Sequence, residues 1–374
     1  MMEYIPKIIA MYLPQFHCIP ENDEFWGKGF TDWVTVKNAQ PLFKGHQQPK
    51  VPLNKNYYDL SIKEHVAWQA KLAKDYGVDG FGIYHYWFNN EKNLLTKPAE
   101  IILENKDIDT HFFFAWDNVS WKRSWSNVSG ANDWAPIMDQ QKTGPSILIP
   151  YVLGEEKDWI NHYHHLLPYF QDQRYMKKDG KPVFIILHYS PEIAKMCCCW
   201  NELAKKDGFD GVFFIFFNEK DTPASEYTFK YEPSFSCFSD VSLYDRIKTK
   251  LKNVFLKDEG LKIRDYDKAW KKILENAAQM PQANAYHGGI VAFDDTPRRG
   301  TRARILKNST PEKFERYLLQ LMKITASQHK DFIFLTAWNE WGEGAALEPD
   351  EVYGLGYLCA LKNAIQRMST VDRV

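Results

Sequence analysis

The chain reads Phe332-Ile333-Phe334-Leu335-Thr336-Ala337-Trp338-Asn339-Glu340-Trp341-Gly342-Glu343-Gly344 near its C-terminus, so that a short apolar run ends in tryptophans, glycines and acids. Similar β-rich runs precede it, and stretches with helical periodicity separate them. The eight runs cover residues 7–13, 78–86, 111–116, 182–188, 211–217, 231–238, 289–293 and 332–338. Because each run is apolar throughout, the pattern predicts an α/β fold, a parallel (β/α)8 TIM barrel, rather than an open doubly wound sheet.

Helical patterns occupy the segments between these runs. They cover residues 61–76, 155–171, 191–206, 265–279, 311–328 and 353–368. The chain has 374 residues, of which 44% are hydrophobic, and this is enough to bury a large core. We expect residues 1–374 to form a single barrel domain, in which the lysine-rich segment at about 240–264 is a solvated excursion.

Polar and aromatic residues follow seven of the eight predicted strands. In a (β/α)8 barrel, the loops after the strands form the functional site, so these side chains should gather at one face. They are Gln15, Phe16 and His17; Tyr84, His85, Tyr86 and Trp87; Trp116, Asp117 and Asn118; His188 and Tyr189; Asn218 and Glu219; Asp294 and Asp295; and Asn339, Glu340 and Glu343.

Several of these residues also have an ordinary structural interpretation. His85 and His188 could be hydrogen-bonded core histidines, and Asp117 could cap the following segment. Asp294 and Asp295 precede Thr296-Pro297-Arg298-Arg299, where an ion pair across a turn is the common explanation.

Glu340 and Glu343 are two carboxylates three residues apart, and tryptophans flank them. Cleavage of a glycosidic bond uses one carboxyl group to protonate the departing oxygen and another to supply or unmask a nucleophile, while aromatic rings hold the C–H face of the sugar. Aromatic residues make up 15% of the chain, with 13 Trp, 20 Tyr and 24 Phe. The pair therefore indicates carbohydrate chemistry, although glutamates after a strand are more often solvated loop residues.

Other classes of function lack support in the sequence. A net charge of −1 gives no reason to expect a nucleic-acid partner, and no apolar segment has the length of a membrane span or signal peptide. We therefore expect a cytoplasmic protein with reduced thiols at Cys197, Cys198 and Cys199. Phosphate-binding loops, a dinucleotide fingerprint and a GxSxG elbow do not occur, and His162, His164 and His165 lack the spacing of a metal site. We expect neither a cofactor nor a metal.

Several sequence blocks together resemble a known family. They are Tyr12-Leu13-Pro14-Gln15-Phe16-His17, Phe25-Trp26-Gly27-Lys28-Gly29-Phe30-Thr31-Asp32-Trp33, Gly45-His46-Gln47-Gln48-Pro49, Gly80-Phe81-Gly82-Ile83-Tyr84-His85-Tyr86-Trp87-Phe88, Asp294-Asp295-Thr296-Pro297-Arg298, and Trp338 to Gly344 with Leu347-Glu348-Pro349-Asp350. Over about residues 4 to 365 the chain resembles WbsX-type proteins, which occur with bacterial surface-polysaccharide genes and are related to the endo-α-mannosidases of glycoside hydrolase family 99.

The resemblance implies a barrel that cleaves an α-mannoside-like bond with net retention. By motif position, Glu340 would remove the proton of the substrate's own 2-hydroxyl, whose oxygen attacks C1, and Glu343 would be the general acid/base, with a 1,2-anhydro sugar as intermediate. Candidates for contact with the oligosaccharide or polysaccharide are Tyr12, Gln15, His17, Trp33, Tyr84, His85, Tyr86, Trp87, Trp116, Asp117, Tyr189, Asn218, Asp294, Arg298, Trp338, Asn339 and Trp341.

Two other functions stay open at this point. WbsX-type proteins are often labelled glycosyltransferases, and Asp294-Asp295 with Arg298-Arg299 could serve a sugar diphosphate, although no clear DxD motif occurs. A catalytically silent polysaccharide-binding barrel would keep the aromatic residues but would tolerate loss of the acids. The intact pair argues against the silent barrel.

Overall fold

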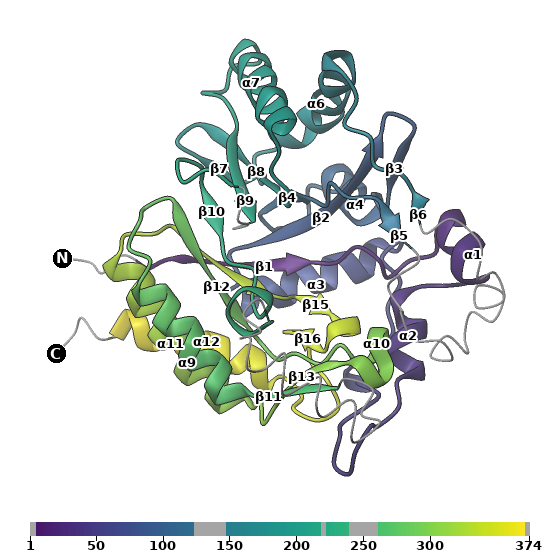
Figure 1. The fold of residues 1–374 in the computed structure, drawn as a ribbon, viewed down its shortest axis with the longest axis vertical. Helices are drawn as coiled ribbons and strands as arrows, with labels where there is room; N and C mark the ends of the chain where they lie inside the picture. Colours follow the sequence, from purple (N-terminus) through teal and green to yellow (C-terminus); the bar gives the residue numbers. More distant parts are fainter. Residues whose placement is uncertain (1–4, 123–146, 218–221, 239–260, 371–374) are drawn as a thin grey trace, which may run out of the picture.

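The computed structural model describes residues 5–122, 147–217, 222–238 and 261–370. Eight parallel strands close into a barrel (Figure 1). In chain order they are β1 (Lys7–Tyr12), β2 (Gly80–Asn89), β4 (Phe112–Trp116), β8 (Lys181–Ile186), β9 (Phe213–Phe217), β10 (Thr228–Phe229), β12 (Ala285–Ile290) and β14 (Phe332–Thr336). Pairing of Lys7 with Phe332 closes the ring between β1 and β14, and this confirms the predicted (β/α)8 fold.

Seven of the predicted runs coincide with barrel strands to within a few residues, but the sixth prediction was wrong. β10 has only the two residues Thr228 and Phe229, ahead of the predicted segment 231–238. Residues Ser234–Phe238 instead form η3, a single π-helical turn. Pro233 lies inside the predicted segment, and it disfavours a central strand there, because proline has no N–H group for the ladder.

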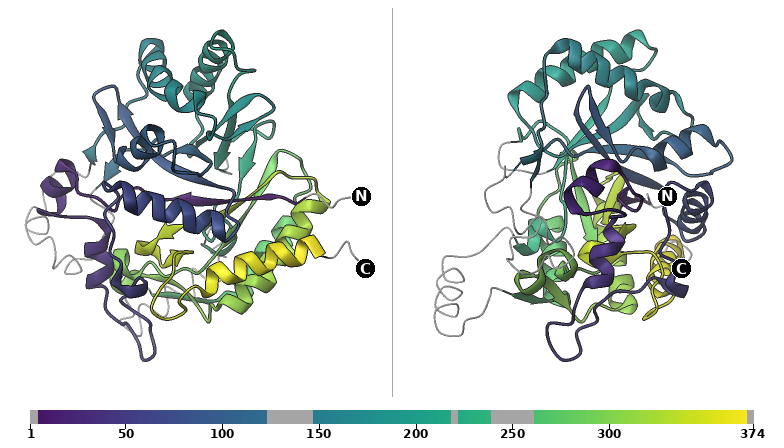
Figure 2. Two further views of the ribbon diagram at one scale, coloured as in Figure 1. Left: turned by 180° about the vertical axis from the view of Figure 1, so that it is seen from behind. Right: turned by 90° about the vertical axis from the view of Figure 1, so that its right-hand side faces the viewer.

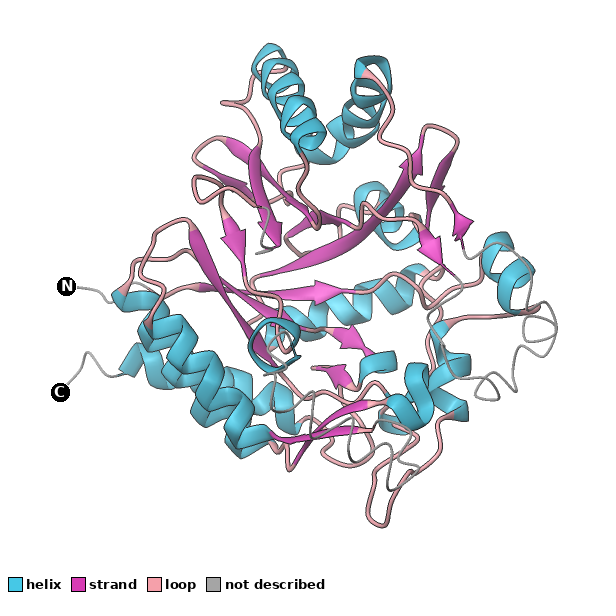
Figure 3. Cartoon of the chain, in the orientation of Figure 1, coloured by secondary structure: helices cyan, strands magenta, loops and turns pink. Residues whose placement is uncertain are grey.

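Helices cover the outside of the barrel (Figures 2 and 3), and each of the long ones lies where the sequence predicts a helix, whereas the helix at residues 97–104 was not predicted. They are α3 (Lys63–Asp75), α4 (Lys97–Glu104), α6 (Glu156–Gln171), α7 (Pro191–Lys206), α9 (Tyr266–Ala278), α11 (Pro311–Ser327) and α12 (Gly356–Thr370). Cys197, Cys198 and Cys199 lie on α7 without a disulfide bond. Along the stretches that the structure describes, none of the helices combines the length and the apolar character that a membrane crossing requires.

Shorter helices and strands lie in the loops around the barrel. The short helices are α1 (Pro20–Trp26), α2 (Asp32–Asn38), η1 (Leu53–Lys55), α10 (Thr296–Arg299), η4 (Gly300–Arg302) and η5 (Trp341–Glu343). The short strands are β3 (Lys92–Leu94), β5 (Trp121–Lys122), β6 (Ile147–Ile149), β7 (Lys177–Lys178), β11 (Lys262–Asp265), β13 (Arg304–Lys307), β15 (Asn339–Glu340) and β16 (Ala345–Ala346). Most of the lysine-rich segment 240–264 lies outside the described residues, and its last residues form β11, which pairs with β13.

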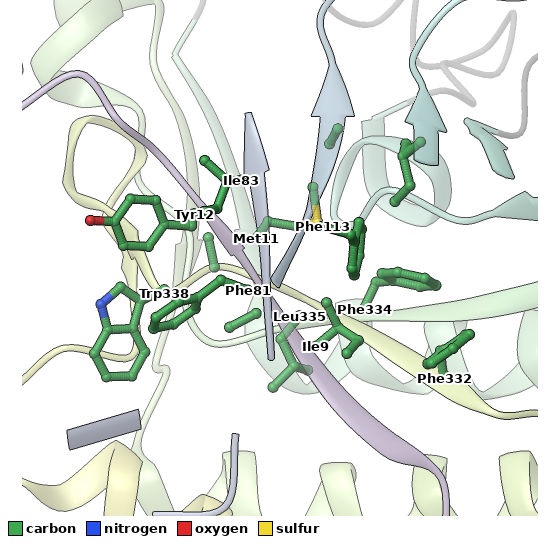
Figure 4. Packing of buried hydrophobic residues seen from close by; sticks show 14 of the residues in the cluster. Ile9, Met11, Tyr12, Phe81, Ile83, Phe113, Phe332, Phe334, Leu335 and Trp338 are labelled. Carbon is green, nitrogen blue, oxygen red and sulfur yellow. The ribbon is translucent and has the colours of Figure 1, made fainter. Parts of the chain in front are cut away.

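Aromatic rings and branched side chains fill the interior. Figure 4 shows Met11, Phe113 and Phe334 among the packed residues of the cluster, and the rings of Phe113 and Phe334 are 6.3 Å apart between centroids. A Cβ atom on Gly82 would lie 2.9 Å from Sδ of Met11 and 3.2 Å from the Phe113 ring, so the crowded interior requires glycine there. Much of the high aromatic content therefore stabilises the barrel itself.

Candidate active site

The Glu340 and Glu343 pair lies on a small hairpin at the carboxyl end of β14. β15 and β16 pair antiparallel across η5, and Gly344 ends η5 with a left-handed φ of 58°, which glycine adopts without strain. Asn339 fixes the hairpin to the end of β1: its Oδ1 accepts the N–H of Leu13 at 2.7 Å, and its Nδ2 donates to the Leu13 carbonyl at 3.0 Å. The pair therefore projects from a rigid part of the barrel mouth.

Arg298 connects the two glutamates with a third carboxylate. Its Nη2 lies 2.7 Å from Glu340 and 2.6 Å from Asp32, and its Nη1 lies 3.3 Å from Glu343. Arg298 comes from α10, after the seventh barrel strand, whereas Asp32 comes from α2, after the first. Three loops thus place one cation among three acids.

The acids compete for that cation. Burial raises the pKa of Glu340, and Arg298 opposes the shift, while the charges of Glu343 and Asp32 add to it. Burial also raises the pKa of Glu343, again against Arg298. Three ionised carboxylates around one guanidinium would leave two excess negative charges in a buried site, so the cluster favours retaining a proton.

The two glutamates differ in their access to solvent. The Glu340 side chain is 5% exposed, and the Glu343 side chain is 19% exposed. Glu340 is thus held against Arg298, whereas Glu343 can exchange protons with water. The difference in exposure suits one carboxyl group that exchanges a proton with a fixed partner, and another that gives a proton to a leaving group and takes one from water.

Two tyrosines of β2 lie beside the acids. The hydroxyl of Tyr84 is hydrogen-bonded to that of Tyr231, and the hydroxyl of Tyr86 accepts a bond of 2.8 Å from Nε2 of Gln15. Burial raises the pKa of both Tyr84 and Tyr86, and the charge of Glu340 adds to the shift. Both phenols stay neutral and can act as hydrogen-bond groups for a sugar.

Asp117 follows β4 on the same side as Tyr86. Burial raises the pKa of Asp117 to about 6, with His188 opposing the shift, and the charge of Asp117 contributes to the raised pKa of Tyr86. Of the predicted contact residues, the structure thus gathers Gln15, Tyr84, Tyr86, Asp117 and Arg298 around the pair.

A second group of predicted contact residues points to the helix layer instead. Successive residues of a strand face opposite sides, so His85 and Trp87 turn outward where Tyr84 and Tyr86 turn inward. His85 is bonded to His162 of α6 at 2.9 Å, and Trp87 stacks on the same ring at 4.4 Å. Trp116 is 1% exposed and packs against His162 as well. We assign His85 and Trp116 to the core, because both are buried and have almost no surface left for a sugar, whereas Trp87 stays partly exposed.

A third group supports the hairpin from behind. Glu348 accepts hydrogen bonds of 2.7 Å from Nε1 of Trp341, the hydroxyl of Tyr58 and Nε2 of Gln69. Tyr12 in turn donates to Gln69 at 2.6 Å. The predicted contact residues Tyr12, Trp33, Trp338, Asn339 and Trp341 are all buried in this layer.

The remaining predicted residues lie elsewhere. His17 is buried near Asp59, and Tyr189 packs edge-on against Phe216. Asn218 lies outside the described residues. The Asp294 carboxylate is held by His46 at 2.7 Å, by Gln48 at 2.8 Å and by Thr296, so its oxygens are engaged within the protein.

Sequence reasoning did not select Asp32, Tyr231 or Glu348. Asp32 and Glu348 do lie in the blocks that carry the family resemblance, Thr31-Asp32-Trp33 and Leu347-Glu348-Pro349, and this signal could have found them. Tyr231 was placed inside the mistaken sixth strand. Among the residues with described positions, no group of three or more His, Cys, Asp or Glu side chains is arranged to hold a metal ion.

Comparison with known proteins identifies the family. Residues 8–361 match the family model described as "Glycosyltransferase WbsX". The chain belongs to the WbsX family. Two curated relatives of this WbsX-family chain, both called "Uncharacterized protein WxcX" and both from strains of Xanthomonas campestris pv. campestris, are 28% identical over 97% of the chain. The match covers 50% of each relative, so the WbsX-family chain spans about half their length.

Solved structures share the fold of this WbsX-family chain. The endo-α-mannosidase of glycoside hydrolase family 99 from Bacteroides thetaiotaomicron matches with a TM-score of 0.54 and 13% identity, over 96% of this chain and 97% of that one. A "Glycoside hydrolase-like protein" matches with a TM-score of 0.55 and 12% identity, over 98% and 95% of the two chains. At this identity the likeness concerns the fold alone.

Proposed function

We propose that this WbsX-family protein is a cytoplasmic retaining glycoside hydrolase that cleaves an α-mannoside-like linkage in a bacterial surface polysaccharide or its precursor. The observation that carries the proposal is the contact of Arg298 with both Glu340 and Glu343, at 2.7 and 3.3 Å, at the carboxyl face of the barrel. Glycosidases place two carboxyl groups around the bond to be cleaved. The shared fold with a family 99 endo-α-mannosidase supports the same class of substrate.

In the proposed first step, Glu340 removes the proton of the sugar's 2-hydroxyl. The O2 electron pair forms a bond to C1 while the C1–O bond to the leaving group breaks, and Glu343 donates its proton to the departing oxygen. In the second step, water attacks C1 while the C1–O2 bond breaks and its electron pair returns to O2; Glu343 takes a proton from that water, and O2 recovers the proton held by Glu340. The axial 2-hydroxyl of a manno sugar lies opposite an axial α leaving group, as this displacement requires.

The geometry supports this division of roles. Burial raises the pKa of Glu340 to about 8, and Arg298, 2.7 Å away, opposes that rise and so favours the ionised form that a base requires. The more exposed Glu343 can reach the attacking water. Tyr84 and Tyr86 provide neutral hydrogen-bond groups, because burial raises the pKa of each well above 10.

A glycosyltransferase that uses a sugar nucleotide is the second candidate, and the description of the family model favours it. The residues available for a diphosphate are engaged with one another, however. Asp295 pairs with Arg299 at 2.9 Å and with Arg304 at 2.8 Å, and Asp294 is held by His46. These contacts favour the hydrolase.

Release of an aryl group from aryl α-mannosides and α-mannobiosides, measured with and without sugar nucleotides, tests the proposal. We expect release without any nucleotide, and we expect Glu340→Gln to abolish it, whereas Glu343→Gln should spare it for aryl groups that leave without a proton. The matched control is Glu275→Gln, on the exposed face of α9, which should behave as the wild type. Consumption of a nucleotide donor, with no release from any glycoside, would establish the transferase instead.

A further inference from the structure

A cavity of about 490 Å³ lies next to the β15–β16 hairpin that carries Glu340 and Glu343. Asp294 and Gly344 form the part of its wall nearest the pair, and neither Glu340 nor Glu343 lines it. The other walls come from the loop at residues 43–50, from β13 and from the start of α11. The cavity is therefore distinct from the surroundings of the two glutamates.

Lysines dominate the charge of this cavity. Lys44, Lys50, Lys307 and Lys313 all line it, whereas Asp294 is the one acid among its described lining residues. The Asp294 carboxylate is already hydrogen-bonded by His46, Gln48 and Thr296. Since the chain as a whole has a net charge of −1, the cluster is a local excess of cations rather than a general basic surface.

Most of these lysines lack a carboxylate partner within the described part of the chain. Lys313 pairs with Asp267 at 2.7 Å, but Lys44, Lys50 and Lys307 form no ion pair with a described acid. Lys307 lies over the ring of Phe43 at 3.8 Å, and this contact fixes its ammonium group without neutralising it. An ammonium group held in this way can bind a carboxylate or a phosphate oxygen.

The cavity also offers groups that suit the rest of a sugar. Asn308, Ser309 and Thr310 bring polar side chains, and α11, a helix of 17 residues, begins at the next residue. Its N-terminal dipole adds to the positive potential of the lysines.

One chain of contacts joins the cavity to the catalytic pair. His46, in the cavity wall, bonds the Asp294 carboxylate at 2.7 Å, and the backbone N–H of Asp294 donates to the carbonyl of Glu343 at 2.6 Å. An occupant of the cavity would therefore lie two contacts from the proposed acid/base.

We propose that this cavity binds the anionic group of an acidic glycan, a uronate carboxylate or a phosphate substituent. The identification of the occupant as part of the substrate rests on the proposed function, whereas binding of the anion does not. Lys307 and Lys44 are the residues that bind it.

Calorimetric titration of the full chain with glucuronic acid, with inorganic phosphate and with glucose tests the proposal. We expect one of the two anions to bind with an affinity that falls as salt is added, and glucose not to bind. Tighter binding of glucuronate would indicate an acidic sugar, and tighter binding of phosphate would indicate a phosphorylated glycan.

Lys307→Gln should weaken anion binding about tenfold or more, the loss expected for one charge-assisted contact. Lys44→Gln should act in the same direction, and because Lys44 is exposed, its replacement should leave folding intact. The matched control is Lys272→Gln, on the exposed face of α9. Absence of anion binding at low salt, or equal binding by wild type and both cavity variants, would overturn the proposal.

The same titration with Glu340→Gln separates the two proposals. We expect this variant to bind the anion as the wild type does. If the wild-type protein binds the anion but cleaves no glycoside, the proposed anion site holds and the proposed hydrolase activity is wrong. If the wild-type protein cleaves a glycoside but binds neither anion, the hydrolase activity holds and the proposed anion site is wrong.

Discussion

Gly342 and Arg298 are in direct contact at the centre of the site: a Cβ atom on Gly342 would lie 2.6 Å from Nε of Arg298. Arg298 cannot move away freely, because Asp32, Glu340 and Glu343 all hold its guanidinium group. The absence of a side chain at position 342 thus lets one arginine reach three carboxylates.

Gly342→Ala should therefore displace Arg298 and misplace the pair. We expect kcat/KM to fall about 100-fold, as a displacement of about 1 Å can cause, with a loss of about 1–3 kcal/mol of stability from overpacking. Steady-state kinetics and thermal unfolding measure the two effects. Gly208→Ala is the control, since its positive φ of 90° also disfavours alanine, but its Cβ would meet no other atom within 4 Å. Equal activity of the two variants would show that the contact at Gly342 does not matter for catalysis.

Arg298→Gln should change the pH dependence of the reaction. Arg298 opposes the rise in the pKa of Glu340, so its removal should raise that pKa further and leave less ionised base at neutral pH. Activity at pH 7 should fall, and part of it should return as the pH is raised. A pH–rate profile of kcat/KM measures the shift, with Arg367→Gln on exposed α12 as the control. An acid limb at the wild-type position would contradict the role given to Arg298.

The two glutamates should respond differently to the leaving group. Glu340→Gln should lower the rate by about 10³-fold or more on every substrate, because it removes the proposed base toward O2. Glu343→Gln should lower it for natural glycosides but spare aryl glycosides whose leaving group needs no proton. Parallel kinetics on both substrate types measure the difference. An equal loss on the two types for Glu343→Gln would reverse or exclude these roles.

Glu348 should make the stability of the protein depend on pH. Burial raises its pKa to about 7, against the hydrogen bonds from Trp341, Gln69 and Tyr58. Because the folded-state pKa is raised, the folded protein binds more protons than the unfolded chain between about pH 4.5 and 7. The stabilising contribution is complete at the acid end of this range and is lost as the pH rises through about 7.

Glu348→Gln should flatten that dependence. Chemical denaturation at a series of pH values between about 5 and 7.5 gives the free energy of unfolding for wild type and variant. We expect the difference between the two curves to correspond to one proton over this range. Parallel curves would mean that Glu348 does not titrate there.

The barrel could be predicted, because the alternation of apolar runs with amphipathic segments is visible in the sequence. Six strands are apolar runs, and the seventh, β12, shares only its last two residues, Gly289 and Ile290, with the predicted run. The sixth strand could not be found in this way, since Thr228 and Phe229 alone carry no periodicity. Their place is set by pairing with Phe216 and Phe217 on one side and with Ala285 and Tyr286 on the other.

The pair itself was also visible in the sequence, because Glu340 and Glu343 follow a buried strand directly. Arg298 and Asp294 were named together as contact residues, yet only the fold separates them: Arg298 contacts the pair, while the Asp294 carboxylate is engaged by His46 and Gln48. Asp32 lies beside the pair only because the loop after the first barrel strand packs against the loops after the last two strands.

The sequence by itself determined the barrel, the position of the acids at its carboxyl face and the family. The tertiary structure alone decided which aromatic residues face the site. In Tyr84-His85-Tyr86-Trp87 the side chains point alternately to the two faces of the strand, and both faces carry aromatic rings. The sequence alone therefore does not show which face points into the barrel. Closure of the barrel decides this, because one face of each strand must fill the interior and the other must pack against helices, and so Tyr84 and Tyr86 meet Glu340 while His85 and Trp87 meet His162.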